Sequence, residues 1–213
     1  MKTDELIEML GTNLEPVKAG QLRSTLMIAL AIGSAAVLCL AFAVFGAPAD
    51  ALRGGHLGLK MLALAFTLGL AAAGASFLAR AARPGEPGRM PLILIGLLFL
   101  CIVAAAGLEL ILAPPAARAG MLFGPQWAAC LICIPLFAAV PFGALIFALR
   151  KGAPTGLMRA GAIAGLVGGA LGAAAFAIHR SADPVAFVAL WYGGPIVLCA
   201  IIGGILGPRL LRW

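Results

Sequence analysis

The sequence predicts an all-α integral membrane protein: a bundle of six transmembrane helices preceded by a short cytoplasmic amphipathic helix. Hydrophobic residues make up 63% of the chain and the mean hydropathy is +1.10. Charged residues make up 11%, less than half of the roughly 25% found in soluble domains. A soluble domain needs polar residues to cover its surface, whereas lipid tolerates an apolar one. The chain also contains 28 glycines. This number favours a membrane protein, because glycine is more frequent in membrane helices than in soluble ones.

Six apolar runs have the length that a membrane crossing requires, which is about 20 residues. Pro, Gly and charged residues separate the runs, as is typical of segments that leave the bilayer. We therefore divide the chain into a cytoplasmic segment, residues 1–24, and a six-helix domain, residues 25–213. The expected helices cover about 25–46, 57–79, 90–113, 128–149, 158–178 and 186–206.

The distribution of Lys and Arg predicts the orientation, since cytoplasmic loops carry an excess of both. With the N-terminus in the cytoplasm, eleven of the fifteen cations fall on that side and four on the other. Both termini are therefore expected in the cytoplasm. The cations are scattered between apolar runs, which argues against a nucleic-acid-binding face. The acidic beginning of the chain indicates no secretory signal. The outer cations are Arg53, Lys60, Arg118 and Arg180.

The N-terminal segment has the pattern of a short amphipathic helix. Thr3 is a suitable N-cap, the acidic residues that follow it suit the positive helix end, and Pro16 ends the pattern. The helix either lies on the lipid headgroups or docks into the groove of a cytoplasmic partner. Its acidic polar face argues mildly against the first alternative. Its apolar face consists of Leu6, Ile7, Leu10 and Leu14.

Small residues recur every four positions in the fifth and sixth apolar runs. This spacing lets membrane helices approach closely. It predicts tight helix packing, within one chain or between two, so the oligomeric state stays open. The pairs are Gly161 with Gly165, Gly165 with Gly169, Gly168 with Gly172, and Gly203 with Gly207.

Glu109 is the one acidic residue inside a predicted helix, about one turn from its outer end. An intramembrane carboxylate is costly and suggests a function by default. We expect it to be paired, with Lys60 as the candidate partner, or to contact water. The alternative is a small transporter or channel with both residues on its pathway. The absence of a convincing internal repeat argues against a transporter.

Cys130 and Cys133 form a C-x-x-C pair where the fourth helix enters from the outer side. A thiol pair in an oxidising compartment can sense or exchange redox state. A membrane thiol oxidoreductase is therefore a further alternative, although such enzymes normally carry a second pair. A four-ligand zinc site would also need a second pair. We expect no metal, no cofactor and no catalytic residues, because the chain contains no recognisable enzyme motif.

Several stretches resemble the NrsF-type membrane anti-sigma factors. They are the opening MKTDELIEMLGTNLEPV, ARPG at 82–85, W-x-x-C at 127–130, RKGAPTG at 150–156, DPVAFVALWYGG at 183–194 and GGILGPRLLRW at 203–213. The resemblance implies a protein that holds an extracytoplasmic-function sigma factor inactive at the bacterial inner membrane until stress releases it. The N-terminal segment is then the natural docking site. Trp191 and Tyr192 are also typical of membrane interfaces.

The resemblance also implies a sensor role for cysteine. In the family, the cysteine of W-x-x-C works with a second cysteine in the last outer loop, in sensing metal or oxidative stress. Cys130 matches the first, but Arg180 takes the place of the second. The disulfide between the two loops is therefore not expected here, and Cys133 would have to substitute in a two-thiol site. Cys130 and Cys133 remain the sensor candidates.

Overall fold

A computed structural model describes residues 21–46, 57–81, 89–124, 126–152, 156–180 and 183–212. The described residues are helical apart from short turns and contain no strand. The predicted N-terminal helix, with Leu6, Ile7, Leu10 and Leu14, lies outside them. The helices are α2 (Gln21–Phe45), α3 (Leu57–Ala81), α4 (Met90–Leu112), α5 (Pro115–Leu122), α6 (Trp127–Arg150), α7 (Leu157–His179), α8 (Val185–Trp191) and α9 (Gly193–Leu210).

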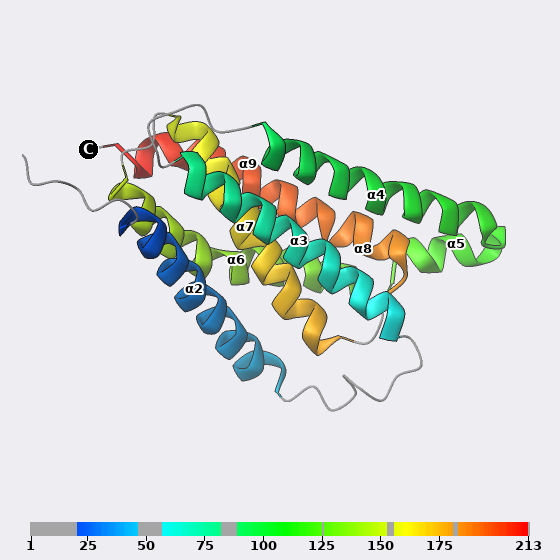
Figure 1. Cartoon of the computed structure of the whole chain (residues 1–213). Coiled ribbons are helices and arrows are strands. Elements are labelled where there is room, and N and C mark those ends of the chain that lie inside the picture. Colours follow the sequence, from blue (N-terminus) through cyan, green and yellow to red (C-terminus); the bar gives the residue numbers. More distant parts are fainter. Residues whose placement is uncertain are drawn as a thin grey trace, which may run out of the picture.

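Six of these helical stretches are long and apolar enough to cross a membrane, as the sequence predicts. The short α5 precedes α6, and α8 leads into α9 through a break at Tyr192. Successive spans alternate in direction, so the molecule is an elongated bundle with two ends (Figure 1). We call them the Arg180 end, where α7 ends and α8 begins, and the Arg150 end, where α6 and α9 end.

The helix α7 lies at the centre of the bundle. It packs against α3, α6 and α9, and 89% of its most apolar stretch is buried, against 17% for α2 and 22% for α4. The outer helices instead expose large apolar side chains along most of their length. A surface of this kind is suited to lipid.

Glycine makes the close approach of α7 and α9 possible. A Cβ atom on Gly207 would lie 2.5 Å from the carbonyl oxygen of Leu157, and one on Gly203 would lie 3.0 Å from the Cα of Gly165. A Cβ atom on Gly161 would overlap the carbonyl oxygen of Gly203. The predicted small-residue faces therefore pack within one chain, backbone against backbone.

A neighbouring stripe of α7 meets α6 in the same way. Cβ atoms on Gly168 and Gly172 would lie 2.9 Å and 2.8 Å from carbonyl oxygens of Ala138 and Ile134. Further out, Gly33 brings α2 against Pro141 of α6. Glycines therefore set the spacing from α9 through α7 and α6 to α2.

Candidate functional site

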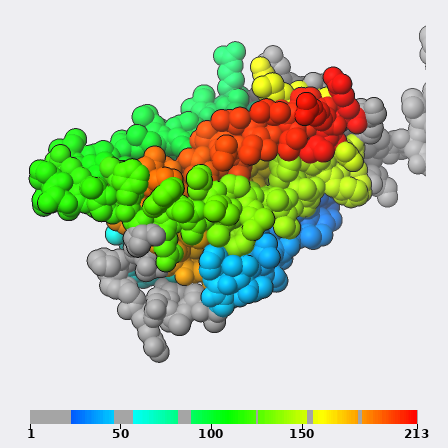
Figure 2. Space-filling view, turned by 180° about the vertical axis from the view of Figure 1, so that it is seen from behind, coloured from blue at the N-terminus to red at the C-terminus, as the bar shows by residue number. Residues whose placement is uncertain are grey.

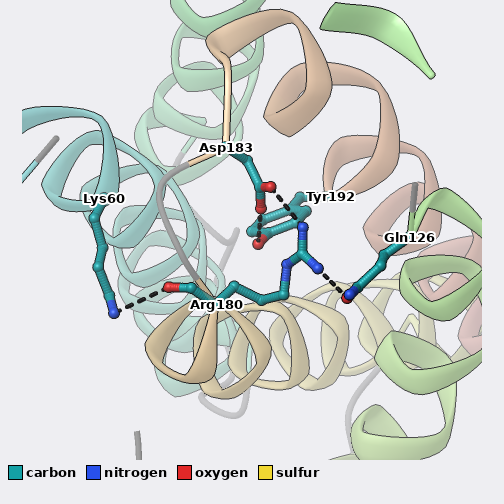
Figure 3. Close-up of polar contacts among 5 residues, drawn as sticks. All are labelled: Lys60, Gln126, Arg180, Asp183 and Tyr192. Carbon is teal, nitrogen blue, oxygen red and sulfur yellow. Dashed lines mark hydrogen bonds and ion pairs between the residues drawn. The ribbon is translucent and has the colours of Figure 1, made fainter. Parts of the chain in front are cut away.

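A polar cluster occupies the Arg180 end of the bundle (Figure 3). The guanidinium of Arg180 donates to Asp183 Oδ1 at 2.8 Å, and the Tyr192 hydroxyl donates to Asp183 Oδ2 at 2.9 Å. A second guanidinium nitrogen of Arg180 donates to Gln126 Oε1. The cluster thus joins the α7–α8 turn to the start of α9 and to the start of α6.

The backbone around the turn explains how these groups meet. The helix α7 ends at His179, and Arg180 follows in an extended conformation with φ −100° and ψ 150°. Pro184, with its ring-fixed φ, then starts α8 directly after Asp183. Tyr192 lies at the break between α8 and α9 and is 1% exposed. The turn aims the carboxylate into the bundle, where the tyrosine hydroxyl meets it.

The charges of the cluster stabilise each other. The Arg180 and Asp183 side chains are only 16% and 10% exposed. Burial alone would lower the pKa of Arg180, but the hydrogen bond and the charge of Asp183 raise it above its ordinary value. Arg180 therefore carries its charge at every pH that a cell meets. Its guanidinium also lies 5.8 Å from the ring centroid of Phe176.

Lys60 and Glu109 do not form the predicted pair. Lys60 Nζ donates to the carbonyl oxygens of Ile178 and Arg180, at 2.8 Å and 3.1 Å, at the C-terminal end of α7. A cation there satisfies carbonyls that the helix leaves without partners. Glu109 Oε2 accepts a hydrogen bond of 2.7 Å from the backbone N–H of Ala186, in the first turn of α8.

Each of the two charges therefore serves a helix terminus. Glu109 lies at the positive N-terminal end of α8 and Lys60 at the negative C-terminal end of α7. The pairing prediction is wrong because both groups find backbone partners that are not visible in the sequence pattern. The backbone bonds of Lys60 and Glu109 explain both charges as structural groups, without a transport pathway.

Cys130 lies beside the polar cluster, whereas Cys133 is only partly buried and packs against the apolar core. Cys130 is fully buried and within electrostatic range of Arg180 and Asp183. Cys133, one turn further along α6, is partly exposed. All five cysteines are free thiols. Arg180, in the position that the family resemblance gives to a second cysteine, is thus brought near Cys130 by the fold.

Aromatic side chains surround the cluster on the side of α5. Trp191 Nε1 donates to the carbonyl oxygen of Leu122 at 2.7 Å, and its ring centroid lies 5.1 Å from that of Trp127. Phe123 meets the same indole edge-on. Tyr192 differs from Trp191, because it is buried and bonded to Asp183. The bond to Asp183 is thus a role that the interpretation of Tyr192 as an interfacial residue did not include.

Sequence reasoning missed the roles of Gln126, Asp183 and Tyr192. Two of them stand in the stretch DPVAFVALWYGG, where an acid before a proline and a tyrosine before two glycines mark the ends of α8. In the described part of the chain, no three His, Cys, Asp or Glu side chains gather closely enough to hold a metal ion. The arrangement can hold helices together and shield the Cys130 thiol.

Comparison with known proteins places the chain in a family. Residues 10–213 match the family model described as NrsF, negative regulator of sigma F. The chain is 30% identical to the probable anti-sigma-F factor NrsF of Azospira oryzae and 32% identical to the anti-sigma-F factor NrsF of Caulobacter vibrioides. Both alignments cover the whole of each chain. No solved structure matches significantly. The chain therefore belongs to the NrsF family of negative regulators of sigma F.

Proposed function

We propose that the chain is a membrane-bound anti-sigma factor that sequesters an extracytoplasmic-function sigma factor at the bacterial inner membrane. The observation that carries the proposal is the full-length match to two relatives named as anti-sigma-F factors. Six helices with the length and composition of membrane spans support the location. The excess of Lys and Arg supports an orientation with the Arg150 end and both termini in the cytoplasm.

The docking site in this proposal is the N-terminal segment, residues 1–24. Its leucine-rich face, Leu6, Ile7, Leu10 and Leu14, has the spacing of a helix that lies in an apolar groove of a soluble partner. Its acidic polar face suits a groove with a basic rim. Bound in this way, the sigma factor is kept from core RNA polymerase without any catalysed reaction.

A transcription assay tests this docking site in cells. Full-length protein should repress a reporter driven by a promoter that depends on the partner sigma factor. Replacing Leu6, Ile7 and Leu10 by Ala should release the reporter, because the apolar face that fills the groove is lost. The matched control is Thr12→Ala, on the opposite face of the predicted helix, which should still repress. Full repression by the leucine-face variant, at equal membrane abundance, would refute the docking site.

Release of the sigma factor on envelope stress is proposed to begin at the Arg180 end, in the periplasm. Cys130 and Cys133 are the sensor candidates, since thiols react with oxidants and soft metals. Because Cys130 is fully buried, a reagent reaches it only when the polar cluster opens. Reaction at Cys130 would then hold the cluster open and loosen the joint between α6, α7 and α9.

Single Ser substitutions distinguish the two thiols. If Cys130 is the sensor, Cys130→Ser should abolish induction of the reporter by an oxidant or a soft metal ion while leaving repression intact. Cys133→Ser should then respond normally, and Cys39→Ser, in an exposed position on α2, serves as the control. Normal induction in a variant that lacks both Cys130 and Cys133 would remove both residues from the sensing step.

A further inference from the structure

A groove runs between α6 and α9 on the face of the bundle that Figure 2 shows, where the two helices lie side by side. It has a volume of about 180 Å³. Its floor is Gly165 of α7, and its two walls come from the middle of α6 and the second half of α9. The lining residues are Pro135, Ala138, Ala139, Phe142, Gly165, Cys199, Ile202, Gly203 and Leu206. Nearly all of these side chains are apolar.

Two arginines lie beyond the end of this groove that is nearest to the C-terminal ends of α6 and α9. Ile202, Leu206 and Arg209 follow each other at intervals of four and three residues, so they share one face of α9. Ala139 and Arg150 are eleven residues apart, about three turns, and share one face of α6. The walls of the groove therefore lead to Arg209 on one side and to Arg150 on the other.

Arg150 is bonded to the residue that follows Arg209, and both arginines are available to an anion. Arg150 Nε donates to the carbonyl oxygen of Leu210 at 2.6 Å, which fixes the end of α6 against the end of α9. Both Arg150 and Arg209 are exposed, and the other nitrogens of each guanidinium can still donate. The acidic residues of the described part, Glu109 and Asp183, are bonded at the Arg180 end.

We propose that this groove is a binding site for one anionic phospholipid of the cytoplasmic leaflet. An acyl chain lies in the apolar groove and the phosphate binds Arg150 and Arg209. The dimensions agree, because Phe142 is eight residues from Arg150, about 12 Å along a helix. This is within the roughly 15 Å thickness of one hydrocarbon leaflet. Basic pockets between helices at the cytoplasmic side are typical sites for such lipids.

The site depends on the proposed membrane insertion and orientation but not on sigma-factor binding. It would fix the spacing of α6 and α9 across Gly165, one of the positions at which α7 and α9 pack backbone against backbone. An anionic lipid would thereby support the geometry that holds both ends of the bundle. Lipid binding and sigma-factor binding are measured separately, so failure of one leaves the other standing.

Native mass spectrometry of the full-length protein in detergent tests the site. The probes are phosphatidylglycerol and phosphatidylcholine with identical acyl chains. We expect one phosphatidylglycerol to remain bound in preference to phosphatidylcholine. Arg209→Gln should weaken its retention about tenfold, the factor that a charge-assisted hydrogen bond contributes. The control is Arg80→Gln. Arg80 is an exposed cation in the last turn of α3, at the Arg150 end of the bundle, so this variant should retain phosphatidylglycerol as the unaltered protein does.

A second variant fills the groove. Ala139 is exposed at the groove wall, so Ala139→Phe should displace the acyl chain while leaving the core intact. Its control is Ala104→Phe, at an exposed position of α4. Equal retention of both lipids would overturn the proposal, as would unchanged phosphatidylglycerol binding in Arg209→Gln and Ala139→Phe. A dimer that Ala139→Phe dissociates would assign the groove to a second copy of the chain instead.

Discussion

At the scale of single residues, most polar groups at the Arg180 end bond to one another or to helix ends, while Arg180 Nε and His179 Nε2 are buried without a partner. Asp183 accepts from both Arg180 and Tyr192, and Glu109 and Lys60 each meet backbone groups of other helices. A polar group buried without a partner is costly. The polar groups at the Arg180 end therefore connect α3, α4, α6, α7 and the α8–α9 pair. We call this set of contacts the joint.

Tyr192→Phe tests the contribution of the tyrosine hydroxyl to this joint. The substitution keeps the ring in place but leaves Asp183 Oδ2 without its donor, so we expect a loss of about 1–3 kcal/mol in the free energy of unfolding. Thermal unfolding in detergent, monitored by tryptophan fluorescence, should show a lower Tm. Arg159→Gln, at an exposed position in the first turn of α7, should leave Tm unchanged. An unaltered Tm in Tyr192→Phe would show that the hydroxyl contributes nothing.

Glu109→Gln distinguishes a structural carboxylate from a transport site. The amide oxygen of Gln can still accept from Ala186, so only the attraction of the negative charge to the start of α8 is lost, about 0.3–1 kcal/mol. Repression of the reporter should therefore be unchanged, while Glu109→Ala should lower Tm further. Ion flux in proteoliposomes that disappears in Glu109→Gln would contradict this role and support a transporter.

At the scale of helices, glycine determines which helices pair. Sequence spacing predicted that α7 and α9 carry small-residue faces, and both faces meet in the structure. The spacing did not indicate which helix each face of α7 would meet. That depends on how all six helices arrange together: Gly161 and Gly165 meet α9, whereas Gly168 and Gly172, on a neighbouring stripe of the same helix, meet α6.

Gly161→Ala tests this packing directly. The added methyl group would overlap the carbonyl oxygen of Gly203, and overpacking of this kind costs about 1–3 kcal/mol. We expect a lower Tm and easier separation of α7 from α9 in denaturing detergent. Gly107→Ala on α4 is the matched control, since no atom lies within 4 Å of the position where its Cβ would stand. Equal Tm values for the two variants would refute tight α7–α9 packing.

Some features of the helix arrangement could be predicted from the sequence, and others could not. Helix number and the small-residue faces followed from composition and spacing, which are local properties. The partners of Lys60 and Glu109 did not, because they are backbone groups 118 and 77 residues away along the chain. The burial of Tyr192 was missed for a related reason: only the break between α8 and α9 turns its hydroxyl towards Asp183.

At the scale of the whole molecule, the described helices have the length and the apolar surface that suit a bilayer. The central helix is covered on all sides, and the outer helices present Leu, Ile, Val, Met and Phe to the surroundings. The proposed orientation places the polar cluster, Cys130 and Cys133 towards the outer membrane surface and both chain termini at the cytoplasmic surface. In the proposed mechanism, a signal sensed at Cys130 would travel the length of the bundle, through the polar cluster and the tight α7–α9 contact.

Single-cysteine labelling tests the orientation. In a cysteine-free background, Arg118→Cys at the Arg180 end and Lys151→Cys at the Arg150 end are both at exposed positions. A maleimide that cannot cross the inner membrane should label Arg118→Cys in intact spheroplasts, and Lys151→Cys only after the membrane is permeabilised. The reverse pattern would invert the topology and place both termini outside the cytoplasm.

The most direct test of the central claim is a pull-down of the detergent-solubilised protein, with mass spectrometry of the bound soluble proteins. The full-length chain is compared with a form that lacks residues 1–22 and is matched for abundance in the membrane. We predict that an extracytoplasmic-function sigma factor is recovered with the full-length chain and not with the shortened one. Recovery of no sigma factor with either form would contradict the account of this protein as an anti-sigma factor.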